Sequence, residues 1–416
     1  MFDLDKWQEI MSTLKKNPLR TFLTAFGVFW GILMLVIMLG SGKGLQNGAM
    51  SDFQGTSTNS FFVWAQRTSK PYMGMQPGRT FSYNNDDAIA LKRIPELAVI
   101  APRNQLGGHE TVNNVVRGLK NGAFDIMGDY PQYNLIEPRN IVSGRFINEV
   151  DITEKRKVAV IGSKVRDVLF EKDEDPISQY ISVNGVYFKV IGVYVPYSSG
   201  EHGGEDSKVV HVPFSTFQHV FNYGNDVGFF AITSRHDIPA SEAEEKVIAL
   251  LKTRHKIAPE DQFAIGHWNV EKQFVKMQGL FSGINILVWV VGIGTLFAGV
   301  IGVSNIMLIV VKERTREIGV RRALGAPPIS IMSQIILESV FLTSFAGYFG
   351  LVTGVGLLEL VSGALGDSGG MFRYPEVDFG IAIKALVILI IAGAIAGLIP
   401  AKRAVSVNTV DALRAE

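Results

Sequence analysis

Four long apolar segments lie unevenly along the chain, one near its start and three near its end. A helix that crosses a hydrocarbon core about 30 Å thick needs about 20 predominantly apolar residues. All four segments are long enough, and the residues between the first and the second are mostly polar. The sequence therefore predicts a four-span membrane protein with a large domain outside the bilayer. The segments are Leu19–Leu39, Ile284–Val311, Ile335–Leu358 and Ile381–Ile399.

Basic residues indicate how these spans are oriented. They precede the first span, separate the second from the third, and follow the fourth. Because cytoplasmic segments carry an excess of lysine and arginine, we expect both termini in the cytoplasm and residues 41–280 on the opposite side. The residues are Lys6, Lys15, Lys16 and Arg20, then Lys312, Arg314, Arg316, Arg321 and Arg322, then Lys402, Arg403 and Arg414.

The composition excludes several classes of function. A formal net charge of +1 leaves no large surface of one sign, so we expect no nucleic-acid partner. Cysteine is absent, and the seven histidines form neither H-x-x-x-H nor H-E-x-x-H. We therefore predict no metal site, no bound cofactor and no catalytic residue in this chain.

A short glycine-rich stretch, residues 40–44, superficially resembles a phosphate-binding loop. Ile37 stands where that motif has its first glycine, and Gly44 replaces the Ser or Thr that would bind magnesium. We therefore expect this chain itself to bind neither ATP nor Mg²⁺ through such a loop.

The third predicted span has acidic residues only toward its two ends, Glu338 and Glu359. An ion or proton relay needs ionisable residues near the midplane of the membrane. A secondary transporter or a channel is therefore disfavoured, and the energy for any work must enter from elsewhere.

The polar region has the pattern of a split domain with an insertion. A strand, a helix and a strand occur in this order before and again after the insertion, and the second helix has a predicted capping box of Ser241 and Glu244. The insertion, residues 120–215, is expected to be mostly β, with a hairpin turn at Asn184-Gly185. The flanking elements are Phe61–Gln66, Asn84–Arg93 and Leu97–Ala101, then Val227–Thr233, Ser241–Lys252 and Phe263–Ile265. The inserted strands are Lys157–Ile161, Ile181–Val183, Tyr187–Val195 and Val209–Val212, and the predicted solvated loops are Pro71–Arg79 and Tyr197–Lys208.

The second span continues a helix that begins outside the membrane. No helix-breaking residue pattern occurs between Val270 and Val311, a stretch that would extend about 60 Å at about 1.5 Å per residue. This is about twice the hydrocarbon thickness, so we expect a rigid stalk between membrane and external domain.

Small residues recur every four positions in the spans and predict close helix contacts. So many small faces favour a homodimer, although packing within one chain is the alternative. The residues expected at these contacts are Gly27, Gly31, Gly294, Ala298 and Gly302, with further stripes at Ala346, Gly350 and Gly354 and at Gly393 and Gly397.

A charged elbow, residues 312–330, joins the second and third spans. Glu313 with Arg316, and Glu317 with Arg321, have the spacing of helix neighbours, and Gly325 with two prolines predicts the end of the helix. A solvated surface helix is the default interpretation, and the position between two spans suggests a site that receives energy. The predicted coupling residues are Glu313, Arg314, Arg316, Glu317, Ile318, Gly319, Arg321, Arg322, Leu324 and Gly325.

Several motifs resemble the MacB/FtsX type of ABC transporter permease. They are the elbow ERTREIGVRRALGA, Leu337-Glu338-Ser339 in the third span, and the closing stretches 397–404 and 411–416. The external runs 143–146, 158–162 and 186–193 extend the resemblance over nearly the whole chain. One departure is visible, because Asn408-Thr409 stands where the family tail often carries Asp-Pro.

The resemblance implies a fold and a set of partners. It implies a helical membrane part of four transmembrane helices and a large α+β extracytoplasmic domain, in which a split β-α-β subdomain called porter carries an inserted β-rich subdomain called sabre. It implies a multi-pass protein of the bacterial inner membrane that forms a homodimer, or a heterodimer with a related permease, and binds a cytoplasmic ABC ATPase through the elbow. A periplasmic adaptor and an outer-membrane channel are possible further partners in such a tripartite assembly.

The implied activity is mechanotransmission from the ATPase to the periplasmic domain, for efflux of a small molecule or peptide. Release of lipoproteins and regulation of a cell-wall hydrolase are the alternatives, and a membrane-anchored ligand sensor is a remote one.

The expected domain plan follows from these features. An interfacial amphipathic helix opens the chain, four spans follow around the split domain and the elbow, and a cytoplasmic tail closes it. The ranges are 1–18 for the helix, 19–40, 271–311, 331–360 and 381–400 for the spans with the stalk, 41–119 and 216–270 for porter, 120–215 for sabre, 312–330 for the elbow, 361–380 for a periplasmic loop, and 401–416 for the tail.

Overall fold

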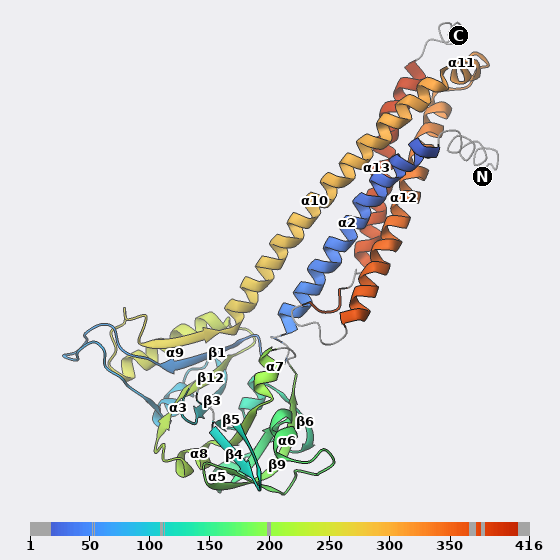
Figure 1. The fold of residues 1–416 in the computed structure, drawn as a ribbon. Coiled ribbons are helices and arrows are strands. Elements are labelled where there is room, and N and C mark those ends of the chain that lie inside the picture. The colour runs from blue at the N-terminus through green and yellow to red at the C-terminus, as the bar shows by residue number, and fades with distance from the viewer. Residues whose placement is uncertain are drawn as a thin grey trace. The chain divides into compact units, whose positions relative to one another are not determined.

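The structure is a computed structural model, and it divides into two compact units (Figure 1). We call residues 50–279 the mixed unit, and residues 1–49 together with 280–416 the helical unit. The predicted fold class, a four-helix membrane part with a large α+β domain, is confirmed. The described residues are 18–51, 53, 55–108, 111, 113–197, 201–365, 372–375 and 379–406.

The part of the chain described here has four helices that are long and apolar enough to cross a membrane. Each contains one predicted span and extends beyond it. The helix predicted from residue 270 is one unbroken element, and Lys384, which falls inside the fourth predicted segment, lies in the second turn of its helix, near an end. The helices are α2 (Pro18–Ser51), α10 (Val270–Glu313), α12 (Pro328–Leu365) and α13 (Phe379–Ser406). Residues 1–17 and 407–416, which hold most of the predicted interfacial helix and of the tail, lie outside the described residues.

The small-residue stripes separate into inward and outward faces. A Cβ atom built on Gly31 would lie 3.5 Å from the Thr295 carbonyl oxygen, and one on Gly27 would lie 4.0 Å from Gly299, so this stripe of α2 packs on α10. The second stripe points away from the described chain, because Ala298 is exposed and a Cβ atom on either of its two glycines meets nothing within 4 Å. Those two glycines are Gly294 and Gly302.

Gly393 lies at a close approach of α13 to α12. A Cβ atom there would lie 2.1 Å from Thr343 Oγ1 and 3.0 Å from Val340 Cα. We expect Gly393→Val to destabilise the helical unit by about 1–3 kcal/mol, the usual cost of overpacking a close contact. The measurement is the denaturant midpoint of purified protein in detergent, with Gly294→Val as the matched control. Equal midpoints for the two variants would contradict this packing.

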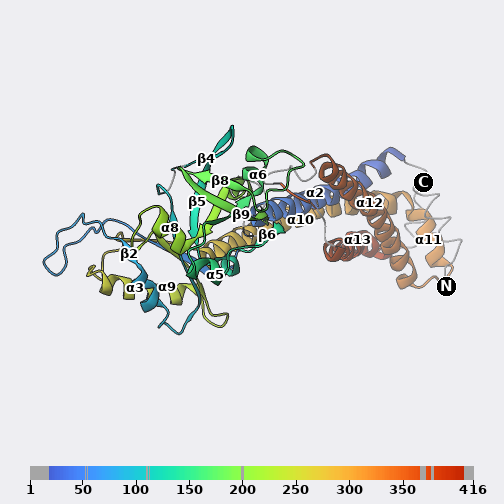
Figure 2. The ribbon, with the colours of Figure 1, turned by 90° about the horizontal axis from the view of Figure 1, so that it is seen from below.

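The two halves of the split domain meet in one sheet, as the repeated strand–helix–strand pattern predicts. Strand β1 (Ser60–Ala65) lies between β12 (Phe229–Ser234) and β13 (Ile265–Asn269), and β3 (Leu97–Gln105) pairs with β12. The helices α3 (Asn85–Leu91) and α9 (Ala240–Arg254) lie side by side (Figure 2). A short two-stranded sheet, β2 (Tyr83–Asn84) with β11 (Asp226–Val227), accompanies them.

The inserted strands close into a ring. Following the pairings from β5 leads through β10, β7, β9, β8 and β4 and back to β5, so each of these strands has at least two neighbours. Valine, isoleucine and phenylalanine side chains fill the interior. The strands are β4 (Asn113–Arg117), β5 (Lys120–Asp129), β7 (Val158–Gly162), β8 (Tyr180–Val183), β9 (Val186–Pro196) and β10 (Val209–Pro213), with β6 (Arg139–Gly144) beside β9. The connecting helices are α4 (Tyr133–Ile136), α5 (Glu149–Thr153), α6 (Ser163–Leu169), α7 (Glu201–Asp206) and α8 (Phe214–Val220).

Some local predictions are wrong. The stretch expected as the loop 197–208 contains α7, and β4 and β5 were not predicted as strands. The expected capping box of α9 is not formed, because Pro239 is its N-cap residue and Glu244 is turned toward β13 and α10. The Asn184-Gly185 turn is confirmed, with φ values of 46° and 88°. The porter and sabre boundaries stay a prediction, and β4 pairs with strands of the insertion.

Candidate functional site

The elbow folds as a short helix, α11 (Thr315–Ala323), between the end of α10 at Glu313 and the start of α12 at Pro328. Arg314 leaves the helical conformation with a ψ of 12°, so Glu313 ends α10 while Arg316 lies on α11. The predicted pairing of Glu313 with Arg316 therefore spans the break between two helices and stays a prediction. Glu317 and Arg321 do pair, with 2.8 Å between Oε1 and Nη2.

Gly325 ends the helix as predicted. Its φ of +93° lies in a region that glycine adopts far more readily than other residues. Its N–H donates to the Arg322 carbonyl at 3.0 Å. Ala326 donates to the Arg321 carbonyl at 3.0 Å, which completes a Schellman motif. The turn therefore satisfies the last carbonyls of α11 before α12 begins at Pro328.

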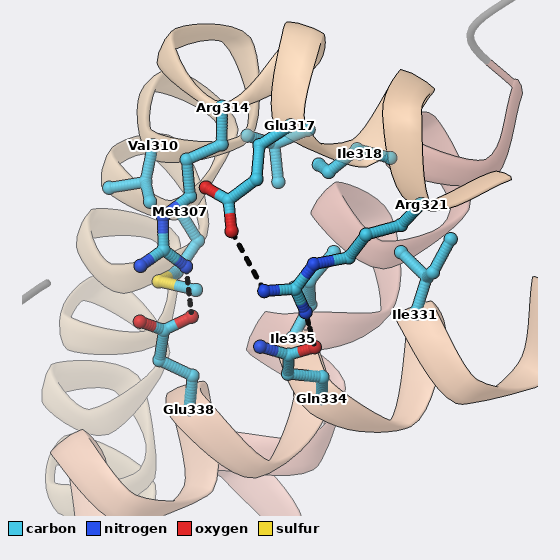
Figure 3. Close-up of a pocket in the computed structure, with 11 residues that line it drawn as sticks. Met307, Val310, Arg314, Glu317, Ile318, Arg321, Ile331, Gln334, Ile335 and Glu338 are labelled. Carbon is cyan, nitrogen blue, oxygen red and sulfur yellow. Dashed lines mark hydrogen bonds and ion pairs between the residues drawn. The ribbon is translucent and has the colours of Figure 1, made fainter. Parts of the chain in front are cut away.

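A pocket lies between α10, α11 and α12 and contains both apolar and charged side chains (Figure 3). Glu338 is only 3 % exposed and lies 3.5 Å from Arg314 Nη1. Arg321 donates to Gln334 Oε1 at 3.1 Å, in addition to its bond with Glu317. These bonds join α11 to α12, and they place the buried Glu338 in an ion pair. The pocket is lined by Met307, Val310, Val311, Arg314, Glu317, Ile318, Arg321, Ile331, Gln334, Ile335 and Glu338.

The predicted coupling residues lie on two faces of the elbow. One group holds the elbow on its own chain: Ile318 and Gly319 are buried, Arg314 and Arg321 bond α12, and Arg322 donates to the Val405 carbonyl of α13 at 2.7 Å. The other group is exposed, and it consists of Glu313, Arg316, Glu317, Leu324 and Gly325. Val320, which the prediction omitted, is 41 % exposed and lies one turn after Arg316. Leu324 is 83 % exposed.

A buried charge cluster in the mixed unit was not predicted. Asp129 at the end of β5 accepts a hydrogen bond from Arg103 Nε and lies 2.6 Å from His211 Nδ1. Burial disfavours the charge of Asp129, but the Arg103 guanidinium and the His211 hydrogen bond outweigh it and lower the pKa of Asp129 to about 2. Burial also lowers the pKa of His211, so its ring is neutral near pH 7. Arg103 lies on β3 of the split subdomain and His211 on β10 of the insertion, so the cluster ties these two parts together.

A second layer of charge surrounds this cluster. Arg139 forms ion pairs with Glu137 at 3.0 Å and with Asp206 at 2.9 Å. The Arg103 guanidinium stacks 3.5 Å from the centre of the Tyr133 ring. Arg103, Asp129 and His211 are ordinary polar residues far apart in the sequence, and the pairing of β5 with β3 and β10 brings them together. Its geometry is that of a structural joint, with every charge partnered.

Residues 366–370 have the G-x-S-x-G pattern of a hydrolase nucleophile elbow. That motif requires a strand before the serine and a helix after it. Here the helix α12 ends at Leu365, directly before the pattern, so the required strand is replaced by a helix. The pattern therefore gives no support to a hydrolase.

Two family models match this chain. Residues 21–250 match the MacB-like periplasmic core domain, and residues 289–409 match the FtsX-like permease C-terminal domain. The macrolide export ATP-binding/permease protein MacB of Shewanella sp. (strain W3-18-1) is 29 % identical over 99 % of this chain and 61 % of its own length. The pyoverdine export ATP-binding/permease protein PvdT of Pseudomonas entomophila (strain L48) is 29 % identical over 96 % of this chain and 58 % of its own length.

Among solved structures, the periplasmic region of MacB from Actinobacillus actinomycetemcomitans is 19 % identical, with a TM-score of 0.43 over 54 % of this chain and 95 % of that one. The chain spans about 60 % of the length of the two curated relatives above. Both matched domains and the four long apolar helices lead to the same assignment. The protein therefore belongs to the MacB/FtsX-type family of ABC permeases and is a multi-pass membrane protein.

Proposed function

We propose that this chain is the transmembrane subunit of an ABC-type export machine that passes mechanical work from a cytoplasmic ATPase to the mixed unit. The observation that carries the proposal is α10, a single helix of 44 residues. It begins directly after the last residue of β13 in the mixed unit and ends at the α11 elbow. At about 1.5 Å per residue it is about 66 Å long.

The exposed face of α11 is the proposed docking site for the ATPase, which binds and hydrolyses ATP with Mg²⁺. Arg316, Val320 and Leu324 follow each other at four-residue spacing and are all exposed. An apolar side chain flanked by charge is suited to a groove on a partner protein. The opposite face, with Ile318 and Gly319, is occupied by the rest of the helical unit.

Leu324→Asp tests this docking site. We expect it to reduce the amount of co-purified ATPase at least about tenfold, because an exposed anchor residue is replaced by a hydrated charge. The matched control is Leu119→Asp, since Leu119 is fully exposed on the β4–β5 turn, in the mixed unit. Equal recovery of ATPase with both variants would refute the docking site.

The proposed topology places both termini and α11 in the cytoplasm and the mixed unit in the periplasm. The absence of cysteine allows single-cysteine labelling with a reagent that does not cross the inner membrane. Leu119→Cys should react in intact spheroplasts, and Leu324→Cys should react only after lysis, since both side chains are well exposed. The reverse pattern would invert the topology.

The proposed cargo is a small molecule, because relatives that match nearly the whole chain are named for macrolide and pyoverdine export. A homodimer, a periplasmic adaptor and an outer-membrane channel complete the proposed assembly. The test is a panel of macrolides and siderophores, with the permease and its ATPase expressed in an efflux-deficient host. Raised resistance or siderophore release supports efflux, whereas retention of lipoproteins in the inner membrane on deletion of the gene would favour lipoprotein release instead.

A further inference from the structure

The start of α10 is attached to the mixed unit without any linker. Asn269 is the last residue of β13, and Val270, which is buried, is the first residue of α10. Asn269 Oδ1 accepts the Lys272 backbone N–H at 3.0 Å and so caps the helix. A cap fixes the first turn of a helix but does not fix the angle between that helix and the rest of the domain.

One buried carboxylate on α9 bonds both sides of this strand–helix junction. Glu244 lies in the second turn of α9 and is only 1 % exposed. Its oxygens lie 2.6 Å from His267 Nδ1 and accept hydrogen bonds from Asn269 Nδ2 at 2.9 Å and from Lys272 Nζ at 2.7 Å. His267 and Asn269 belong to β13 and Lys272 to the first turn of α10, so this one side chain connects three elements. A further bond runs from the Ser241 N–H to Glu271 Oε2 at 3.3 Å.

Helix α9 is itself firmly held. Its apolar residues Ala243, Val247 and Leu251 are buried against the sheet of β1, β12 and β13. Burial disfavours a charge on Glu244, but the bonds from Lys272 and Asn269 outweigh this effect and lower its pKa, so the group is ionised near pH 7. A buried ion pair is a poor source of net stability, because the desolvation of the charges offsets most of their attraction. The arrangement is therefore better explained by the geometry that it imposes.

The mechanical argument follows from the length of α10. Force applied at the far end of so long a helix produces its largest bending moment where the helix enters the mixed unit. If the backbone were the only connection there, its torsion angles would act as a hinge and the helix would tilt without moving the sheet. Bonds from Glu244 to both sides of the strand–helix junction prevent that tilt.

We propose that Glu244 is a positioning residue for force transmission: it locks α10 to α9, so that movement of the stalk is transferred to the sheet of the mixed unit. This inference rests on the proposed function, and it adds the joint through which the stroke would enter the mixed unit. His267, Asn269 and Lys272 are the other members of the joint. Glu245, the next residue along α9, is exposed and takes no part in it.

The test measures the joint directly. Spin labels are attached at Ala249→Cys on α9 and Lys276→Cys on α10, two exposed positions of a cysteine-free chain. The protein is studied in lipid nanodiscs as the complex with its ATPase. The matched control for Glu244→Gln is Glu245→Gln. In the wild type and in this control, we expect a narrow distance distribution that ATP with vanadate does not change. In Glu244→Gln we expect the distribution to broaden at least about twofold, since the joint then acts as a hinge.

A loss of folding would also broaden the distribution, so the Tm of each variant is measured in parallel. Lys272→Met is the second variant, because the Lys272 side chain is 44 % exposed and its removal leaves the sheet core untouched. Broadening in Lys272→Met at a wild-type Tm supports the joint. A distribution in either variant as narrow as that of the wild type overturns it, because a purely structural Glu244 changes the Tm and not the angle.

A second label pair separates this inference from the proposed function. Ala249→Cys with Leu360→Cys places one label in each unit, and Leu360 is 71 % exposed near the end of α12. If ATP with vanadate leaves this distance unchanged in the wild type, mechanical transmission is wrong. The broadening in Glu244→Gln appears without nucleotide, so it still decides whether the joint exists.

Discussion

Gly279→Pro is expected to abolish most cargo efflux while the partner ATPase continues to hydrolyse ATP. Gly279 lies on α10, and a Cβ atom built there meets nothing within 4 Å. Proline inside a helix removes one hydrogen bond and clashes with the carbonyl four residues earlier, at a cost of about 3 kcal/mol or more, and it kinks the helix. A kinked stalk bends under load, so we expect efflux to fall at least about tenfold.

The control for this prediction is Gly279→Ala. Alanine fits the open space and favours the helix by about 1 kcal/mol relative to glycine, so efflux should stay at the wild-type level. Efflux is measured with the compound that the macrolide and siderophore panel identifies, at equal amounts of protein in the membrane. Wild-type efflux by Gly279→Pro would show that a continuous α10 is not needed.

Asp129→Asn has the largest expected effect on folding. The change leaves the Arg103 guanidinium, whose side chain is 6 % exposed, without its charge partner in the interior of the mixed unit. Breaking a buried ion pair from one side costs about 3–5 kcal/mol. The double variant Arg103→Met/Asp129→Asn should lose less than the sum of the two single variants, and a double-mutant cycle of urea midpoints measures this difference. Additive losses would mean that the pair is not coupled.

The same pair makes stability depend on pH. The folded-state pKa of Asp129 is about 2, below its ordinary value, so its contribution is present above about pH 4 and is lost as the pH falls toward 2. The lowered pKa of buried His211 also makes the protein less stable as the pH falls. Below about pH 6.5, this histidine binds a proton more readily in the unfolded chain than in the folded one. We expect the difference in unfolding free energy between wild type and Asp129→Asn to shrink by about 2 kcal/mol between pH 5 and pH 2. A constant difference would contradict the assigned pKa of Asp129.

The sequence was most informative where periodicity and length decide structure. The spans, the unbroken α10 and the split sheet were predictable because apolar length, the lack of helix breakers and a repeated strand–helix–strand order each have one simple structural solution. The end of α11 at Gly325 was predictable because few residues other than glycine adopt its positive φ.

The rest depended on contacts between residues far apart in the chain. Glu244 fitted a local capping pattern with Ser241, yet its partners are Asn269 and Lys272, which only the packing of α9 against β13 brings near. Asp129 and His211 are 82 positions apart and meet through strand pairing. The two faces of α11 could not be assigned either, because the burial of Ile318 and Gly319 depends on how the helices pack. Long-range pairing, which residue spacing does not encode, accounts for these misses.

The most direct measurement is the distance between labels at Ala249→Cys in the mixed unit and Leu360→Cys in the helical unit, with the ATPase partner either free of nucleotide or trapped with ATP and vanadate. Transmission along α10 predicts that trapping shifts this distance in the wild type and in Gly279→Ala, and that the shift disappears in Gly279→Pro. A wild-type distance that is the same in both states of the ATPase would contradict it.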